Sequence, residues 1–262
     1  MNMVKYYIKR SICSPVFAGS ILLLTFIMVI GCYPADLAVA RENPMSVLYC
    51  FLVTSSVGVA HVVVPLITII PFLFHQVEDL HKGAVYFRLA RGNRRGEMAG
   101  KITAALLSAM LVSLVSLFLF TGVCLLFGAG GDPGTALPSW FAGRFFEERI
   151  KTDTWSVYAV YGLAFVFYSM PWVLIGLVAS LIVKNWYMVF ALPFIAEIVV
   201  CYVTENPTLY WLHPGTGLLK GRVQNLFGGG IFYSFLYNGG MCLGLILLYR
   251  FLWIRRWRNE GI

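Results

Sequence analysis

Two ionisable side chains, His61 and Glu197, lie inside long apolar stretches of the sequence. His61 occurs in SSVGVAHVVVPL and Glu197 in ALPFIAEIVV. If each stretch crosses a membrane as a helix, both side chains come near the midplane, about 15 to 20 Å along the helix from a membrane face. An ionisable group at that depth is costly, and it marks an ion or substrate pathway unless it hydrogen-bonds to a neighbouring helix. Both roles remain open for this pair, whose members could also bond to each other or across a dimer axis.

Motifs for enzymatic chemistry are absent from the sequence. It contains no Gly-x-Ser-x-Gly, His-Glu-x-x-His or paired-carboxylate motif, and its four histidines are scattered. Gly100-Lys101 does not form a nucleotide-binding loop, because Arg95 stands where the motif needs glycine and Ile102 where it needs serine or threonine. The sequence therefore predicts no catalytic residue and no cofactor in this chain.

The six cysteines lie at positions 13, 32, 50, 124, 201 and 242, without a Cys-x-x-Cys pair or a companion histidine cluster. This pattern predicts neither a metal site nor thiol redox chemistry. All six are expected to pack as small apolar side chains. Cys32 and Cys201 both fall near the predicted outer face, so they are the pair that oxidation could join.

The composition defines the elements that must position these residues. Of 262 residues, 59% are hydrophobic and only 12% are charged, which is typical of an integral membrane protein rather than a soluble one. The apolar stretches predict an all-α fold with a single transmembrane domain over residues 1–262. Its six spans are expected at about 16–35, 47–74, 102–127, 156–183, 187–203 and 231–253.

Basic residues indicate the orientation of the spans, because Lys and Arg near the ends of spans stay on the cytoplasmic side. With the N-terminus inside, most of the 20 Lys and Arg residues lie in cytoplasmic segments. The prediction is a multi-pass protein of the cell membrane with both termini cytoplasmic. Residues 1–12, MNMVKYYIKRSI, are expected to form an amphipathic elbow helix at the inner surface, with a plain basic flank as the alternative. The net charge of +8 then reflects topology and anionic lipid, and requires no nucleic-acid partner.

The longest charged segment, residues 76–101, separates the second and third predicted spans. Its sequence is QVEDLHKGAVYFRLARGNRRGEMAGK. A segment of this composition lies in water or at the headgroup surface, and its interleaved aromatic and basic residues favour contact with a soluble partner. A plain solvated basic loop would explain the arginines but not the aromatic residues.

The whole pattern resembles the membrane subunit of an ABC exporter of the type-2 class, which works with a separate ATPase. The resemblance covers the basic elbow, the six spans, the charged first inner loop and the three-residue second inner turn. Within residues 76–101 the run DLHKG and the run FRLARGNRR resemble permeases that export bacteriocins or peptide antibiotics.

The resemblance implies that residues 76–101 form a coupling helix in a cleft of the ATPase, which binds ATP and magnesium. It implies a second permease, either the same chain or a paralogue, and a pathway lined by the second and fifth spans for an amphipathic peptide, drug or lipid. The residues implied in ATPase coupling are Asp79, Leu80, Gly83, Phe87, Arg88, Arg91, Arg94 and Arg95. Two other classes stay open: a secondary transporter or channel that uses His61 and Glu197, and a membrane scaffold that transports nothing.

Overall fold

A computed structural model of the chain contains eight helices and no strand among the residues that it describes. The described residues are 3–32, 47–56, 60–81, 94–127, 129, 153–183, 185–204, 209, 212, 215 and 230–259. The helices are α1 (Met3–Ile12), α2 (Pro15–Gly31), α4 (Val47–Ser56), α5 (Ala60–His81), α7 (Arg94–Leu126), α9 (Thr154–Ile182), α10 (Trp186–Val203) and α12 (Gly230–Asn259). The all-α prediction is confirmed for this part of the chain.

Five of the helices are long and apolar enough to cross a membrane. These candidate spans are Val62–Asp79, Arg95–Leu126, Thr154–Ile182, Trp186–Val203 and Phe232–Arg256. The pair α1 and α2 passes the same test jointly but is bent by 54°, so the total is six if that pair is one span. These helices indicate a multi-pass membrane protein.

Two helices extend further into residues 76–101 than the span predictions allow. α5 continues to His81 and α7 already begins at Arg94, whereas the spans were expected to end at 74 and to begin at 102. Charged residues such as Arg, Glu and Lys are strong helix formers, so a helix does not stop where its apolar stretch stops. The predicted span 47–74 is represented by α4 and the first part of α5, and residues 57–59 between them lie outside the description.

The bend between α1 and α2 has a local cause in the sequence. Ser14 has extended backbone angles and its side chain accepts a hydrogen bond from the backbone N–H of Phe17, which caps α2. Pro15 occupies the first helical position, where its missing N–H costs nothing. A new helix therefore starts at residue 15 in a new direction.

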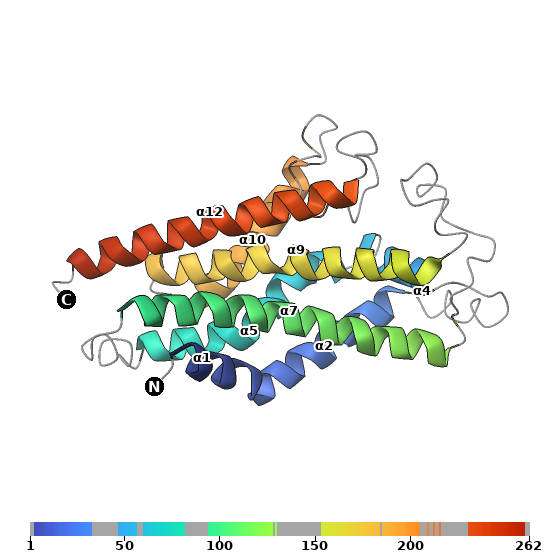
Figure 1. Cartoon of the computed structure of the whole chain (residues 1–262), viewed down its shortest axis with the longest axis horizontal. Coiled ribbons are helices and arrows are strands. Elements are labelled where there is room, and N and C mark those ends of the chain that lie inside the picture. Colours follow the sequence, from blue (N-terminus) through green and yellow to red (C-terminus); the bar gives the residue numbers. More distant parts are fainter. Residues whose placement is uncertain are drawn as a thin grey trace.

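The central element of the bundle is α9, which contains no charged residue. It is 78% buried and packs against α5, α7, α10 and α12 (Figure 1). A helix that is apolar on all sides is suited to such a position. Gly176 allows α5 to approach closely, because a Cβ atom there would lie 2.4 Å from Leu73 Cδ1.

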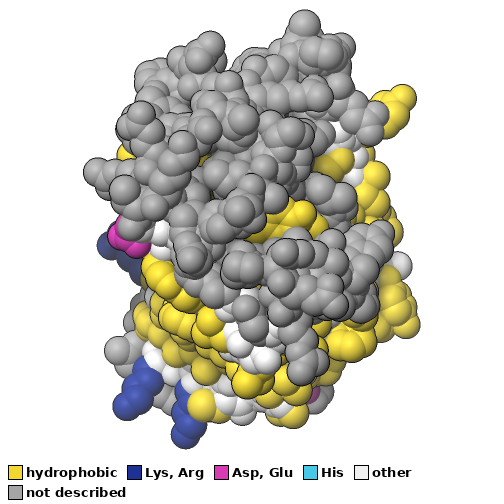
Figure 2. Space-filling model, turned by 90° about the vertical axis from the view of Figure 1, so that its right-hand side faces the viewer, with side chains coloured by type: hydrophobic (Ala, Val, Ile, Leu, Met, Phe, Trp, Pro, Cys, Tyr) yellow, Lys and Arg dark blue, Asp and Glu magenta, His cyan; other side chains and the backbone are white. Residues whose placement is uncertain are grey.

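α10 and α12 lie at the periphery and are mostly exposed, with only 17% and 11% of their spans buried. Their exposed side chains include Tyr202, Leu236, Leu243 and Leu247. Figure 2 views the bundle from the end where α7 finishes and α9 begins, and hydrophobic side chains cover much of the described surface. Surfaces of this kind suit lipid or a second membrane subunit.

One end of the bundle collects several helix ends that are far apart in the sequence. The start of α1, the end of α5, the start of α7 and the end of α12 all lie at the left of Figure 1. The beginning and the end of the described chain are thus on the same side of the bundle.

The packing of α1 on α7 can be tested at Gly100. A Cβ atom there would lie 3.2 Å from the backbone of Met3 and 3.0 Å from Tyr7 Cδ2, whereas a Cβ at Gly122 of the same helix meets nothing within 4 Å. We expect Gly100→Leu to lower the free energy of unfolding in detergent by about 1–3 kcal/mol relative to Gly122→Leu, because overpacking displaces α1. Equal melting temperatures of the two variants would contradict this packing.

Candidate functional site

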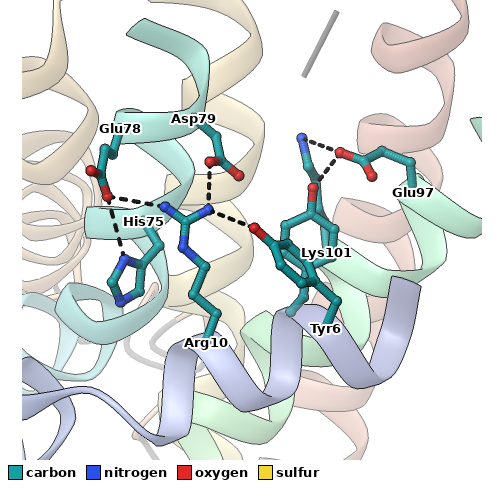
Figure 3. Close-up of polar contacts among 8 residues, drawn as sticks. Tyr6, Arg10, His75, Glu78, Asp79, Glu97 and Lys101 are labelled. Carbon is teal, nitrogen blue, oxygen red and sulfur yellow. Dashed lines mark hydrogen bonds and ion pairs between the residues drawn. The ribbon is translucent and has the colours of Figure 1, made fainter. Parts of the chain in front are cut away.

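At the end of the bundle shown on the left of Figure 1, polar side chains of α1 bind both α5 and α7. We name this cluster the α1 junction. It consists of Tyr6, Tyr7 and Arg10 of α1, His75, Glu78 and Asp79 of α5, and Glu97 and Lys101 of α7 (Figure 3).

The first half of the α1 junction is built around the guanidinium group of Arg10. Its Nη1 atom donates to Asp79 Oδ1 at 2.5 Å, and its Nη2 atom donates to Glu78 Oε2 at 3.0 Å (Figure 3). Asp79 is buried and Arg10 is three-quarters buried. One guanidinium group therefore makes a charge-assisted hydrogen bond to each of two neighbouring carboxylates in the last turn of α5.

The second half is built around Glu97, in the first turn of α7. The Tyr7 hydroxyl donates a hydrogen bond to Glu97 Oε1, which also lies 3.5 Å from Lys101 Nζ. Glu97 and Lys101 are both buried. Lys101 Nζ further lies 4.8 Å from the centre of the Trp253 ring, so a cation–π contact extends the cluster to α12.

These contacts give α1 a bridging position. Tyr7 and Arg10 are three residues apart and therefore lie on neighbouring parts of one helix face, yet they bind different helices. Arg10 binds the end of α5 and Tyr7 binds the start of α7. Residues 82–93 connect those two helix ends along the chain, so α1 contacts the helices on both sides of the central part of the predicted coupling segment.

The predicted coupling residues fall into three groups. Asp79 does not face outward but is buried against Arg10. Arg95 is exposed in the first turn of α7, whereas Leu80 and Arg94 lie at helix ends with side chains outside the description. The remaining four lie outside the described residues altogether: Gly83, Phe87, Arg88 and Arg91.

Glu197 is fully buried in α10. The hydroxyl of Tyr168, on α9, donates to Glu197 Oε1 at 2.5 Å, and Cys201 Sγ lies 3.6 Å from the same oxygen. The carboxyl group thus faces α9, while Val199 and Tyr202 form part of the exposed side of α10. For Glu197 this geometry favours the structural role, a hydrogen bond to a neighbouring helix.

His61 is the second residue of α5, and its side chain is outside the description. The candidate span of that helix begins at Val62, so His61 lies at the start of α5 rather than in the middle of one continuous helix. The predicted contact between His61 and Glu197 therefore stays a prediction.

A groove of about 350 Å³ opens beside the α1 junction, between the end of α5 and the start of α10. It is lined by Phe74, Val77, Glu78, Trp186 and Phe190. Most of this lining is apolar, with one carboxylate that is already bound to Arg10. The groove is suited to an apolar side chain or an acyl chain.

Sequence reasoning missed the residues that hold the α1 junction together. Arg10 contacts residues 68 and 69 positions away and Tyr7 one 90 positions away, so no local spacing indicates these pairs. One signal was available: Glu97 and Lys101 are an i,i+4 pair of opposite charge, the spacing at which side chains on a helix meet.

Comparisons with known proteins found no match to this chain among protein-family models, curated proteins or solved structures. Among the residues that the structure describes, no group of three His, Cys, Asp or Glu side chains is arranged to hold a metal ion. The fold and the site together define a helical multi-pass membrane protein with an ionic junction at one end.

The contact between Arg10 and Asp79 predicts an interaction energy that can be measured. Arg10→Ala should lower the free energy of unfolding by about 1–3 kcal/mol, because it leaves a buried carboxylate without its cation. Adding Asp79→Asn should restore part of that loss, since a neutral amide is easier to bury than a charge. Lys9→Ala, at an exposed neighbouring position, is the control; a double variant no more stable than Arg10→Ala would contradict the pairing.

The bond between Tyr168 and Glu197 predicts a second effect on stability. Tyr168→Phe removes the donor from a buried carboxyl group and should cost about 1–3 kcal/mol. Tyr202→Phe, on the exposed side of α10, should change stability by less than about 0.5 kcal/mol. The stability of both variants is compared by thermal unfolding in the same detergent. Equal losses of stability would argue against the hydrogen bond between Tyr168 and Glu197.

Proposed function

We propose that this chain is the membrane-spanning subunit of an ATP-driven ABC exporter of the type-2 class. It crosses the cytoplasmic membrane six times, with α1 as an elbow helix at the inner surface and both termini in the cytoplasm. Three features support this: the set of long apolar helices, the 54° bend between α1 and α2, and the meeting of the start of α1 and the end of α12 at one end of the bundle (Figure 1).

The α1 junction is the observation that carries the proposal. A permease driven by a separate ATPase needs a cytoplasmic segment that receives a push and passes it to the membrane helices. Here the helices that flank residues 82–93 are both bound to α1, through Asp79 on one side and Glu97 on the other. A displacement of the segment would therefore move α1 together with the ends of α5 and α7.

The same contacts offer a route to the last helix. Lys101 is buried beside Glu97 and lies over the ring of Trp253, near the end of α12. Buried ion pairs resist separation, because pulling them apart leaves an uncompensated charge in a medium of low polarity. The end of the bundle around the α1 junction would consequently respond to the ATPase as a unit.

ATP and magnesium bind the partner ATPase in this proposal, since the sequence contains no nucleotide-binding motif. Two permease subunits, identical or paralogous, enclose the pathway between them. The apolar, largely exposed surfaces of α10 and α12 provide area for such a contact. The cargo proposed from the family resemblance is an amphipathic peptide, drug or lipid.

Co-purification tests the proposal. The tagged protein, extracted in mild detergent, should bring down an ATP-binding subunit identified by mass spectrometry. Arg88→Glu with Arg91→Glu should abolish this, because the charge reversal falls within the predicted ATPase contact. The matched control is Arg255→Glu with Arg258→Glu, which reverses two exposed arginines at the end of α12 and should retain the subunit.

Two other results would argue against the proposal or against the predicted ATPase contact. If the unaltered protein purifies alone as a stable monomer, the exporter proposal fails and a secondary transporter, channel or scaffold replaces it. If the subunit is lost equally in both double variants, binding depends on general positive charge and the predicted contact is wrong.

A further inference from the structure

The groove between the end of α5 and the start of α10 is open to the surroundings of the bundle. It has a volume of about 350 Å³ and is lined by Phe74, Val77, Glu78, Trp186 and Phe190. Val77 is buried, whereas Phe74 and Trp186 are exposed, at 48% and 40%. A molecule beside the bundle can therefore enter the groove without any helix moving.

The groove lies at membrane depth. The candidate span of α5 ends at Asp79 and that of α10 begins at Trp186, so all five lining residues lie inside candidate spans. None is more than about 8 Å from the end of its span, at 1.5 Å per residue. The groove is therefore at the border between the hydrocarbon core and the headgroups, where it meets lipid rather than a soluble protein.

The groove has a polar end and an apolar end. Glu78 and Trp186 lie at the ends of the spans, whereas Phe74 and Phe190 lie one helical turn further in, about 6 Å deeper. Tryptophan is typical of the headgroup level. A phospholipid in the groove would thus have its headgroup beside Glu78 and an acyl chain beside the two phenylalanines.

Charges of both signs meet at the polar end. Glu78 Oε2 accepts a hydrogen bond from Arg10 Nη2 at 3.0 Å and lies 3.7 Å from His75 Nδ1 (Figure 3). The side chains of Arg10 and Glu78 are 25% and 34% exposed, so both can be reached from outside. The headgroup that complements them carries one negative and one positive charge.

Arg10 has hydrogen-bonding capacity beyond its contacts in the protein. A guanidinium group has five N–H donors. The three hydrogen bonds that Arg10 donates within the described part of the chain go to Tyr6, Glu78 and Asp79. Phosphate oxygens suit the remaining donors.

Glu78 and Trp186 together suit an ammonium group. An ionised carboxylate has about four acceptor positions, so Glu78 can accept from an ammonium as well as from Arg10. The face of the Trp186 ring offers a cation–π contact to the same group.

We propose that the groove binds one phospholipid with a primary ammonium headgroup, such as phosphatidylethanolamine. Its phosphate accepts hydrogen bonds from Arg10, and its ammonium donates to Glu78 beside the Trp186 ring. One acyl chain lies along Phe74 and Phe190. The proposal requires that α5 and α10 cross a membrane, and it does not depend on the exporter function.

Glu78 selects the headgroup. Phosphatidylglycerol has a phosphate but no ammonium, so its negative charge would lie beside the carboxylates of Glu78 and Asp79 without compensation. The bound lipid should therefore be phosphatidylethanolamine even where both lipids are present.

Counting retained lipids tests this selection. The protein is reconstituted in vesicles of equal amounts of phosphatidylethanolamine and phosphatidylglycerol, extracted in mild detergent and washed, and the lipids left on each chain are measured by mass spectrometry. Phosphatidylethanolamine should be retained in excess. Glu78→Gln should lower the ratio of retained phosphatidylethanolamine to phosphatidylglycerol about tenfold, the effect of losing one charge-assisted hydrogen bond.

A second pair of variants tests the groove itself. Trp186→Ala removes one wall and should lower the total retained lipid several-fold. Tyr202→Ala is the matched control, because it removes an exposed aromatic side chain of α10 that does not line the groove, and it should retain as much lipid as the unaltered protein.

Retention of both lipids in their vesicle ratio would overturn the proposal, as would the absence of any retained lipid or equal losses in Trp186→Ala and Tyr202→Ala. If a variant folds poorly, the unaltered protein decides. Phosphatidylethanolamine with a photoreactive acyl chain, irradiated in the same vesicles, should label peptides containing Phe74 or Phe190 more than those containing the exposed Leu243 of α12; equal labelling would overturn the proposal. No ATPase is needed, so this outcome is independent of the co-purification.

Discussion

Charges that enter a membrane protein have to be neutralised where they are buried, and in this chain that requirement positions three helices at once. Asp79 lies in the last turn of α5 and Glu97 in the first turn of α7, and both side chains are buried. Arg10 of α1 neutralises Asp79, whereas Lys101 of α7 itself neutralises Glu97 and Tyr7 of α1 donates a hydrogen bond to it. α1 is thereby fixed across the bundle end, and the direction of α2 follows from the 54° bend that separates the two helices.

The fold was largely predictable, because long apolar stretches without charges have few alternatives to a membrane helix. The boundaries of the helices were less predictable. The apolar pattern ends near residue 102, but α7 extends back to Arg94, since helix propensity, unlike hydropathy, does not distinguish a buried apolar residue from Glu97 or Lys101. α1 was expected from its basic and aromatic residues and is confirmed as a helix over Met3–Ile12.

The site was predicted only in part, for a physical reason. An intramembrane carboxyl group such as Glu197 is conspicuous in a sequence, but its partner Tyr168 is one of 14 tyrosines and nothing local singles it out. Likewise Asp79 was selected for an external contact, and the structure gives it an internal one with Arg10. Partners that are separated by tens of residues become visible only when the helices are packed together.

The order of the helices along the chain, with α1 before α5 and α7, has a consequence for biosynthesis. A chain is made and inserted from its N-terminus, so Tyr7 and Arg10 are already at the membrane when α5 and then α7 leave the ribosome. Asp79 and Glu97 can each meet their partner on α1 as soon as their helix is synthesised, without waiting for the rest of the bundle. α9, which has no charge to neutralise, can enter the lipid unaided and complete the core afterwards.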